Sequence, residues 1–279
     1  MQKYLNLLHE VLNTGIKTEG RNGITRSIFG RQVQYDLTEH FPILTSKKIA
    51  FNVIVGELLG FIHGYTHIND FNKLDCKIWD ANAEAWNKGG SLGRIYGAQW
   101  RNWKSIDPET TEPIEVDQLQ ITIDNIKNDP FSRRHIITAW NPGELSFMAL
   151  PPCHLLLQFY VSCDDDTNVP KYLSLMVYQR SADIFLGIPF NITSYSLLLS
   201  MISQLTNLKP LHFIHSLGNI HLYEDHVSIA KKQLRRKVKA YPTLELNPDV
   251  ACITQFTPND IKLRNYKSCL LYTSPSPRD

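Results

Sequence analysis

The stretch that most constrains the fold is residues 150–208. Two apolar runs, residues 153–161 and 172–179, flank an aspartate-rich turn at residues 163–168. Such runs, bounded by polar turn residues, are typical of β-strands. Residues 191–208 then repeat apolar side chains at helical spacing, which predicts a long helix with one buried face. Strands followed by a long helix, with no repeat and no interdomain linker elsewhere, indicate a single α+β domain.

The remaining segments extend this pattern. Periodicity predicts helices over residues 4–12 and 51–63, another ending near residues 129–130, and a basic helix through residues 231–237. Alternation predicts further strands over residues 27–37 and 136–140. An irregular, aromatic-rich segment is expected at residues 78–104, and an acidic surface loop at residues 105–117.

Bulk composition excludes several classes of protein. The 279 residues are 43% hydrophobic, enough for a sizeable core, and the net charge of +2 argues against a general nucleic-acid binder. Five cysteines without a CxxC pair suggest neither a disulfide framework nor a zinc site. The N-terminus lacks the apolar run of a signal peptide, and no apolar stretch reaches the roughly 20 residues that span a bilayer. We therefore expect a cytoplasmic protein with reduced thiols.

Cys153 is the strongest candidate for chemistry. It begins one predicted strand, while Arg180, Ser181 and Asp183 close the next. A free thiol has a pKa of about 8.5 and becomes a good nucleophile only when its thiolate is stabilised, which Arg180 could do. Neighbours on a strand face opposite ways, so His154 is a poor general base for Cys153, which argues against a cysteine hydrolase. The alternative is an inert buried thiol.

Other polar residues admit a structural and a functional interpretation. Arg21, between glycines, is either a solvated loop charge or an anion clamp. Glu57 is either the solvated edge of a helix or a partly buried acid with a raised pKa. Arg133 and Arg134, which should point to opposite faces of an extended segment, are either a surface pair or phosphate ligands. Asn191 could be merely a helix N-cap.

The aromatic-rich segment also has two interpretations. Clusters such as Trp79, Trp86, Tyr96, Trp100 and Trp103 usually belong to a core. Here polar residues and glycines interrupt them, and flat rings beside polar atoms suit a flat heterocyclic ligand.

Four motifs in order resemble those of the thymidylate synthase family. They are Leu150-Pro151-Pro152-Cys153-His154, Gln179-Arg180-Ser181, the run from Asp183 to Asn191, and His221-Leu222-Tyr223. The resemblance extends from Tyr4 to about Ser268. It implies a homodimer whose single α+β domain, residues 1–268, has a large twisted mixed sheet at the dimer interface and helices on the other side.

The resemblance implies the methylation of deoxyuridylate (dUMP) to thymidylate (dTMP). Methylenetetrahydrofolate would be the carbon donor and reductant, leaving as dihydrofolate, and no metal would take part. The Cys153 thiolate would add to C6 of uracil, which is covalent catalysis. The catalytic residues implied are Cys153, Glu57, Tyr96, Arg180 and Asn191.

The resemblance also implies the binding residues. Those for dUMP are Arg21, Arg133, Arg134, Arg180, Ser181, Asp183, Asn191, His221 and Tyr223, with Arg133 and Arg134 donated across the dimer interface. Those for folate are Lys47, Trp79, Asp183 and Gly187. His154 and Gln179 would lie behind these groups, with His154 in a water network. Asn191 favours uracil, because related hydroxymethylases that act on cytosine carry aspartate there.

Four positions depart from the family pattern. The loop around Arg21 lacks the usual aspartate and Thr-Gly repeat, Gly60 stands in place of tryptophan, and Asn219 in place of aspartate. Without the tryptophan ring, Gly60 predicts a gap or a repacked wall. Residues 269–279 are rich in Ser and Pro and do not resemble the family's closing tail, so they are expected to be disordered or foreign. The alternatives are therefore a pyrimidine-nucleotide hydroxymethylase and a nucleotide-binding protein inactive through loss of that lid.

Overall fold

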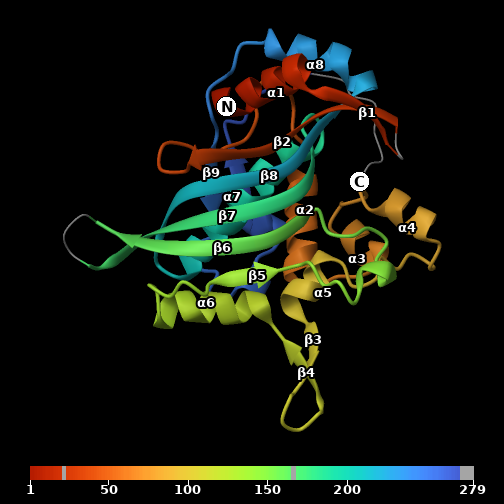
Figure 1. Ribbon diagram of the computed structural model, residues 1–279. Helices are drawn as coiled ribbons and strands as arrows, with labels where there is room; N and C mark the ends of the chain where they lie inside the picture. The colour runs from red at the N-terminus through yellow and green to blue at the C-terminus, as the bar shows by residue number, and fades with distance from the viewer. Residues whose placement is uncertain (21–22, 165–167, 271–279) are drawn as a thin grey trace.

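A six-stranded mixed sheet organises the molecule (Figure 1). The computed structural model describes residues 1–20, 23–164 and 168–270. The strand order is β1-β2-β8-β7-β6-β5; β7 and β8 run parallel, and the other neighbouring pairs are antiparallel. The strands are β1 (Ile16–Gly20), β2 (Gly23–Asp36), β5 (Ile136–Thr138), β6 (His154–Cys163), β7 (Pro170–Asp183) and β8 (Lys209–Tyr223).

Helix α7 (Gly187–Leu205) connects the two parallel strands and packs on one face of the sheet. Parallel neighbours need such a crossover, because the end of the first strand and the start of the second lie at opposite ends of the strands. The helix is apolar on nearly all sides and is almost wholly buried. Alternate residues of β6, β7 and β8 point toward it and form the core, including Leu157, Phe159, Leu175, Val177 and Phe213.

Shorter elements surround this centre (Figure 1). The other α-helices are α1 (Gln2–Thr14), α2 (Phe51–Ile62), α3 (Ile68–Asn72), α4 (Asp80–Trp86), α5 (Tyr96–Arg101), α6 (Gln118–Asn128) and α8 (Val227–Leu234). Two small hairpins are β3 (Trp103–Ile106) with β4 (Pro113–Val116), and β9 (Thr243–Leu246) with β10 (Ile261–Arg264). No helix in the described part of the chain is long and apolar enough to cross a membrane.

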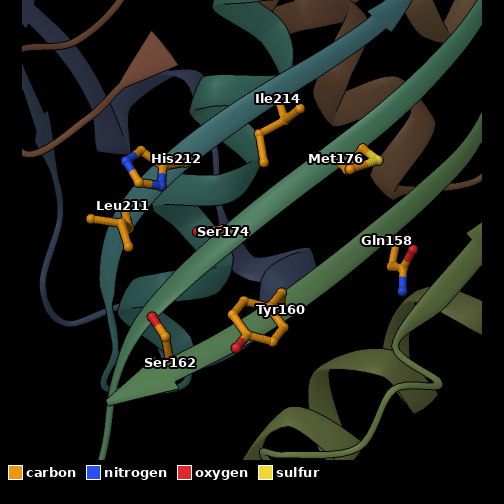
Figure 2. Close-up of a pocket in the computed structure, with 8 residues that line it drawn as sticks. All are labelled: Gln158, Tyr160, Ser162, Ser174, Met176, Leu211, His212 and Ile214. Carbon is orange, nitrogen blue, oxygen red and sulfur yellow. The ribbon is translucent and has the colours of Figure 1, made fainter. Parts of the chain in front are cut away.

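The opposite face of the sheet is not covered by any described helix (Figure 1). Its outward side chains include large apolar groups at 37–63% exposure, namely Leu156, Tyr160, Met176 and Tyr178. A hollow of about 390 Å³ lies on this face. Figure 2 shows it lined by side chains of β6, β7 and β8: Gln158, Tyr160, Ser162, Ser174, Met176, Leu211, His212 and Ile214.

The α+β architecture is confirmed, and most predicted helices and strands are present with small changes in their ends. The basic helix, however, ends at Leu234, so that residues 235–237 follow it, and the segment 78–104, predicted to be irregular, contains α4 and α5. The prediction of a loop at residues 105–117 holds for residues 107–112, which join two strands, but is wrong for the residues on either side. Residues 103–116 form a hairpin in which Lys104 faces Glu115 across the strands, and the charges that suggested a loop lie on its exposed surface. The predicted turn at residues 163–168 and the unusual end at residues 269–279 fall partly outside the described residues.

Candidate active site

Cys153 lies immediately before β6 and beside Arg180 of β7. The Arg180 main chain donates to the Cys153 carbonyl at 2.9 Å, and its guanidinium Nη2 lies 3.7 Å from Cys153 Sγ. The guanidinium also donates to the carbonyls of Pro151 and Pro152, and it lies over the Trp140 ring. A cation held this firmly beside a largely buried thiol favours the thiolate.

Tyr96 holds the main chain of Cys153 from the other side. Its hydroxyl accepts the Cys153 N–H at 2.7 Å, and its ring packs against His154. Burial raises the pKa of Tyr96 well above its usual value, so the phenol is neutral. Its O–H hydrogen therefore remains to be donated toward a ligand or water.

His154 points away from the thiol, as its place on the strand predicts. Its Nε2 lies 2.9 Å from Asn191 Nδ2, and its Nδ1 lies 2.8 Å from the Tyr195 hydroxyl. Burial, assisted by the charge of Arg180, lowers the pKa of His154 to about 3. A neutral imidazole with both nitrogens engaged is not a base for Cys153.

Asn191 lies inside α7 and not at its N-cap, so the alternative interpretation of Asn191 as merely a helix cap is wrong. The helix begins four residues earlier, at Gly187, because residues 184–186 already turn the chain. Gln179 Nε2 donates to Asn191 Oδ1 at 3.1 Å, and Gln179 Oε1 faces His215 Nε2 at 2.7 Å. Neither His215 nor Tyr195 was expected here, since both join the site only through sheet and helix packing.

Glu57 projects from α2 into the interior. Trp79 Nε1 donates to its carboxylate at 3.1 Å, and the side chain is 9% exposed. Burial raises the pKa of Glu57 to about 7, against the opposing effect of the Trp79 hydrogen bond. An acid with this pKa exchanges its proton near neutral pH. The interpretation of Glu57 as a solvated helix edge is therefore wrong.

Phe71 fills the space beside Gly60. A Cβ on Gly60 would lie 2.3 Å from Phe71 Cε1, so no gap remains. The Phe71 ring also packs against the rings of Phe61 and Trp79. Of the two predicted consequences of Gly60, the structure has the repacked wall.

Asp183, at the end of β7, has one carboxylate oxygen that accepts hydrogen bonds and one that accepts none from the described residues. Oδ1 accepts from the main-chain N–H groups of Phe185 and Leu186. Oδ2 is buried and has no hydrogen-bond partner among the described residues. Such an orphan acceptor is suited to a ligand donor. A Cβ on Gly187 would lie 3.6 Å from Asp183 and 3.7 Å from Asn191, so a larger side chain would occupy space between them.

Lys47 is turned inward. It is 4% exposed, donates to the Phe185 carbonyl at 2.5 Å and lies over the Phe185 ring. Burial lowers its pKa to about 8, with Asp183 acting in the opposite direction. A lysine that contacts a folate tail in solvent would have to leave this position.

The parallel pairing of β7 and β8 brings two motifs together. Ser181 pairs with Asn219 and Asp183 with His221. Asn219 Oδ1 lies 3.0 Å from His221 Nδ1, so asparagine at this position can still orient the imidazole. Tyr223 packs edge-on to His221.

The remaining predicted arginines are not in this group. Arg133 and Arg134 precede β5, which begins at Ile136 as predicted, and both are exposed. Arg21 lies outside the described residues. Among the described residues, no cluster of three or more His, Cys, Asp or Glu side chains could hold a metal ion.

Comparison with known families agrees with this arrangement. A model of the thymidylate synthase family matches residues 2–272, almost the whole chain.

Proposed function

Since the chain belongs to the thymidylate synthase family, we propose that it converts dUMP to dTMP with methylenetetrahydrofolate as carbon donor and reductant. The observation that carries the proposal is the contact of Arg180 with Cys153 Sγ. Tyr96 accepts from the Cys153 main chain, Asn191 contacts the adjacent His154, and Asp183 lies near Asn191 on the other side of Gly187. Cysteine, fixed cation, amide and acid are the groups that nucleophilic addition to a uracil ring requires.

The first step is attack by Cys153 on C6 of uracil. A sulfur–carbon bond forms, and the electrons of the C5–C6 double bond move toward C5 and O4. Arg180 keeps the sulfur anionic before attack, and Asn191 holds the O4 and N3 edge of the ring. Glu57, with a pKa of about 7, exchanges a proton with O4 through water. C5 is thereby made nucleophilic.

Later steps use the same residues. When bound, methylenetetrahydrofolate supplies the one-carbon unit and the hydride. Tyr96 assists removal of the C5 proton through water, and Cys153 leaves as the C5–C6 double bond re-forms. Asp183 would offer its unpaired Oδ2 to the pterin, near Trp79, and Gly187 would keep side-chain atoms out of the space between Asp183 and Asn191. Lys47 would meet the folate tail after turning outward.

The phosphate would be held by arginines from two subunits. Arg180, Ser181 and Arg21 belong to the chain that carries Cys153, while Arg133 and Arg134 would reach the other subunit's site. His221 and Tyr223 would bind the ribose 3′-hydroxyl. Two features support the dimer: the uncovered apolar sheet face and the exposure of both arginines within one chain.

The direct test is a mass-spectrometric product assay with dUMP and methylenetetrahydrofolate. Thymidylate is expected, and Cys153→Ser should produce none while still binding dUMP. A hydroxymethylated product would replace the proposal with the hydroxymethylase. Unchanged dUMP, with binding retained, would identify a nucleotide-binding protein without turnover.

Subunit mixing tests the shared site. Cys153→Ser and an Arg133→Ala, Arg134→Ala double variant should each be nearly inactive. Random exchange makes half of the dimers mixed, each with one intact site, so about a quarter of wild-type activity should return. No recovery, with exchange shown by differently tagged subunits, would contradict the donation of these arginines.

A further inference from the structure

A line of buried polar side chains crosses the molecule from β8 through β7 to α7. His215 Nε2 lies 2.7 Å from Gln179 Oε1, and Gln179 Nε2 lies 3.1 Å from Asn191 Oδ1. Asn191 Nδ2 is 2.9 Å from His154 Nε2. All four side chains are at most 9% exposed. Inside a protein each donor in such a line must meet an acceptor. The donor-to-acceptor direction of one hydrogen bond therefore determines the direction of the others.

The carbonyl of Ser181 sets that direction. A main-chain carbonyl only accepts, and Gln179 Nε2 donates to it at 2.8 Å. The second hydrogen of Gln179 Nε2 is directed at Asn191 Oδ1. Gln179 Oε1 is then the atom that faces His215, so His215 Nε2 must carry a proton.

The histidines are neutral and each carries one ring proton. Burial lowers the pKa of both His215 and His154 to about 3. In His215 the proton is on Nε2, and Nδ1 has no hydrogen-bond partner among the described residues. In His154 Nε2 accepts from Asn191, so Nδ1 donates to the Tyr195 hydroxyl.

Asn191 therefore keeps one N–H hydrogen and one oxygen lone pair for a ligand, in a fixed order. Uracil offers an acceptor at O4 and a donor at N3, whereas cytosine offers a donor at N4 and an acceptor at N3. Binding cytosine would require the Asn191 amide to reverse. Reversal would set Asn191 Nδ2 against Gln179 Nε2, and Gln179 cannot turn without losing its bonds to Ser181 and His215.

We propose that His215 is a positioning residue that, through Gln179, fixes the direction of the Asn191 amide and thereby the preference for uracil over cytosine. The proposal rests on the proposed function and specifies how that site selects its base. His215 itself would touch neither nucleotide, because Gln179 lies between it and Asn191.

Equilibrium binding of dUMP and of dCMP to the full chain tests the proposal without turnover. His215→Phe keeps a flat ring but removes the donor, and it should lower the ratio of dUMP to dCMP affinity by about ten-fold, the scale of one buried hydrogen bond. His215→Gln can again donate and should restore most of the ratio. The matched control is His9→Gln, at an exposed position of α1, which should leave the ratio unchanged.

The possible results distinguish a failure of the role of His215 from a failure of the proposed function. A folded His215→Phe protein with wild-type selectivity would overturn the role of His215 while leaving the proposed function intact. A wild-type chain that binds neither nucleotide would overturn both.

A second measurement needs no variant and covers the case in which His215→Phe fails to fold. Long-range ¹H–¹⁵N spectra of the wild-type imidazoles should show His215 protonated on Nε2 and His154 on Nδ1. The opposite tautomer at either position would break the line of donors and overturn the proposal.

Discussion

Glu57 projects from α2 into the interior, and the burial of its carboxyl group makes the protein's stability depend on pH. Its pKa is about 7 in the folded chain against an ordinary value of 4.5. Between these two values the folded chain holds a proton that the unfolded chain has lost. Glu57 therefore destabilises the folded state progressively as pH rises from 4.5 through 7.

Glu57→Gln removes this titration and should raise stability at high pH while abolishing methyl transfer. The free energy of unfolding of the variant, relative to wild type, is expected to increase by about 3 kcal/mol between pH 4.5 and pH 8. Urea unfolding of both proteins across this range measures the difference. Parallel pH profiles for the two proteins would show that Glu57 does not titrate as described.

Residues of the site differ in how far the sequence could predict them. The contact of Cys153 with Arg180 follows from the strand pair and the motifs that end it. His215 could not be found in this way, because its link to Gln179 depends on the register of β7 against β8. The inward position of Lys47 could not be predicted from the sequence either, since it depends on contacts with the carbonyl and ring of Phe185.

At the scale of elements, α2 and α3 pack closely where the Phe71 ring of α3 lies against Gly60 of α2. Alanine ordinarily stabilises a helix by about 1 kcal/mol relative to glycine. Here Gly60→Ala would place Cβ 2.3 Å from the Phe71 ring, so a net loss of about 1–3 kcal/mol is expected. Phe71→Leu in the same chain should relieve the overlap.

A double-mutant cycle by chemical unfolding measures this coupling, which should be at least about 1 kcal/mol. Asn52→Ala, at an exposed position of α2, is the matched control and should combine additively with Phe71→Leu. If the effects of Gly60→Ala and Phe71→Leu on the free energy of unfolding were also additive, α2 and α3 would accommodate the added Cβ without strain.

Helices and strands could be predicted where apolar side chains recur at a regular spacing, and could not where most residues of a segment are charged. The 3.6-residue period of α1 and the apolar runs of β6 and β7 predicted all three elements. In the β3–β4 hairpin the acidic residues concealed a short strand pair, because only Trp103, Ile106, Ile114 and Val116 supply apolar positions. Short hairpins with exposed faces carry little periodic signal.

At the scale of the whole molecule, the uncovered sheet face is the proposed dimer interface. Met176→Glu would put a charge among the apolar side chains of that face, and burying it in a dimer would be costly. The variant is expected to fold and to sediment as a monomer. Ile106→Glu changes an apolar side chain that is more exposed, at 64% against 37% for Met176, and that lies on the β3–β4 hairpin; it should leave the dimer intact. Sedimentation velocity compares them, and a Met176→Glu dimer would place the interface elsewhere.

The parallel pair β7–β8 also determines when the site appears during folding. These strands cannot pair until α7 has closed the loop between them, and closing such loops is slow compared with forming local structure. Arg180 and Asp183 on β7, Asn191 on α7 and His221 on β8 thus reach one another in a single kinetic event. A refolding chain should acquire affinity for dUMP, the proposed substrate, together with amide protection of β7 and β8, and earlier intermediates should be unable to bind it.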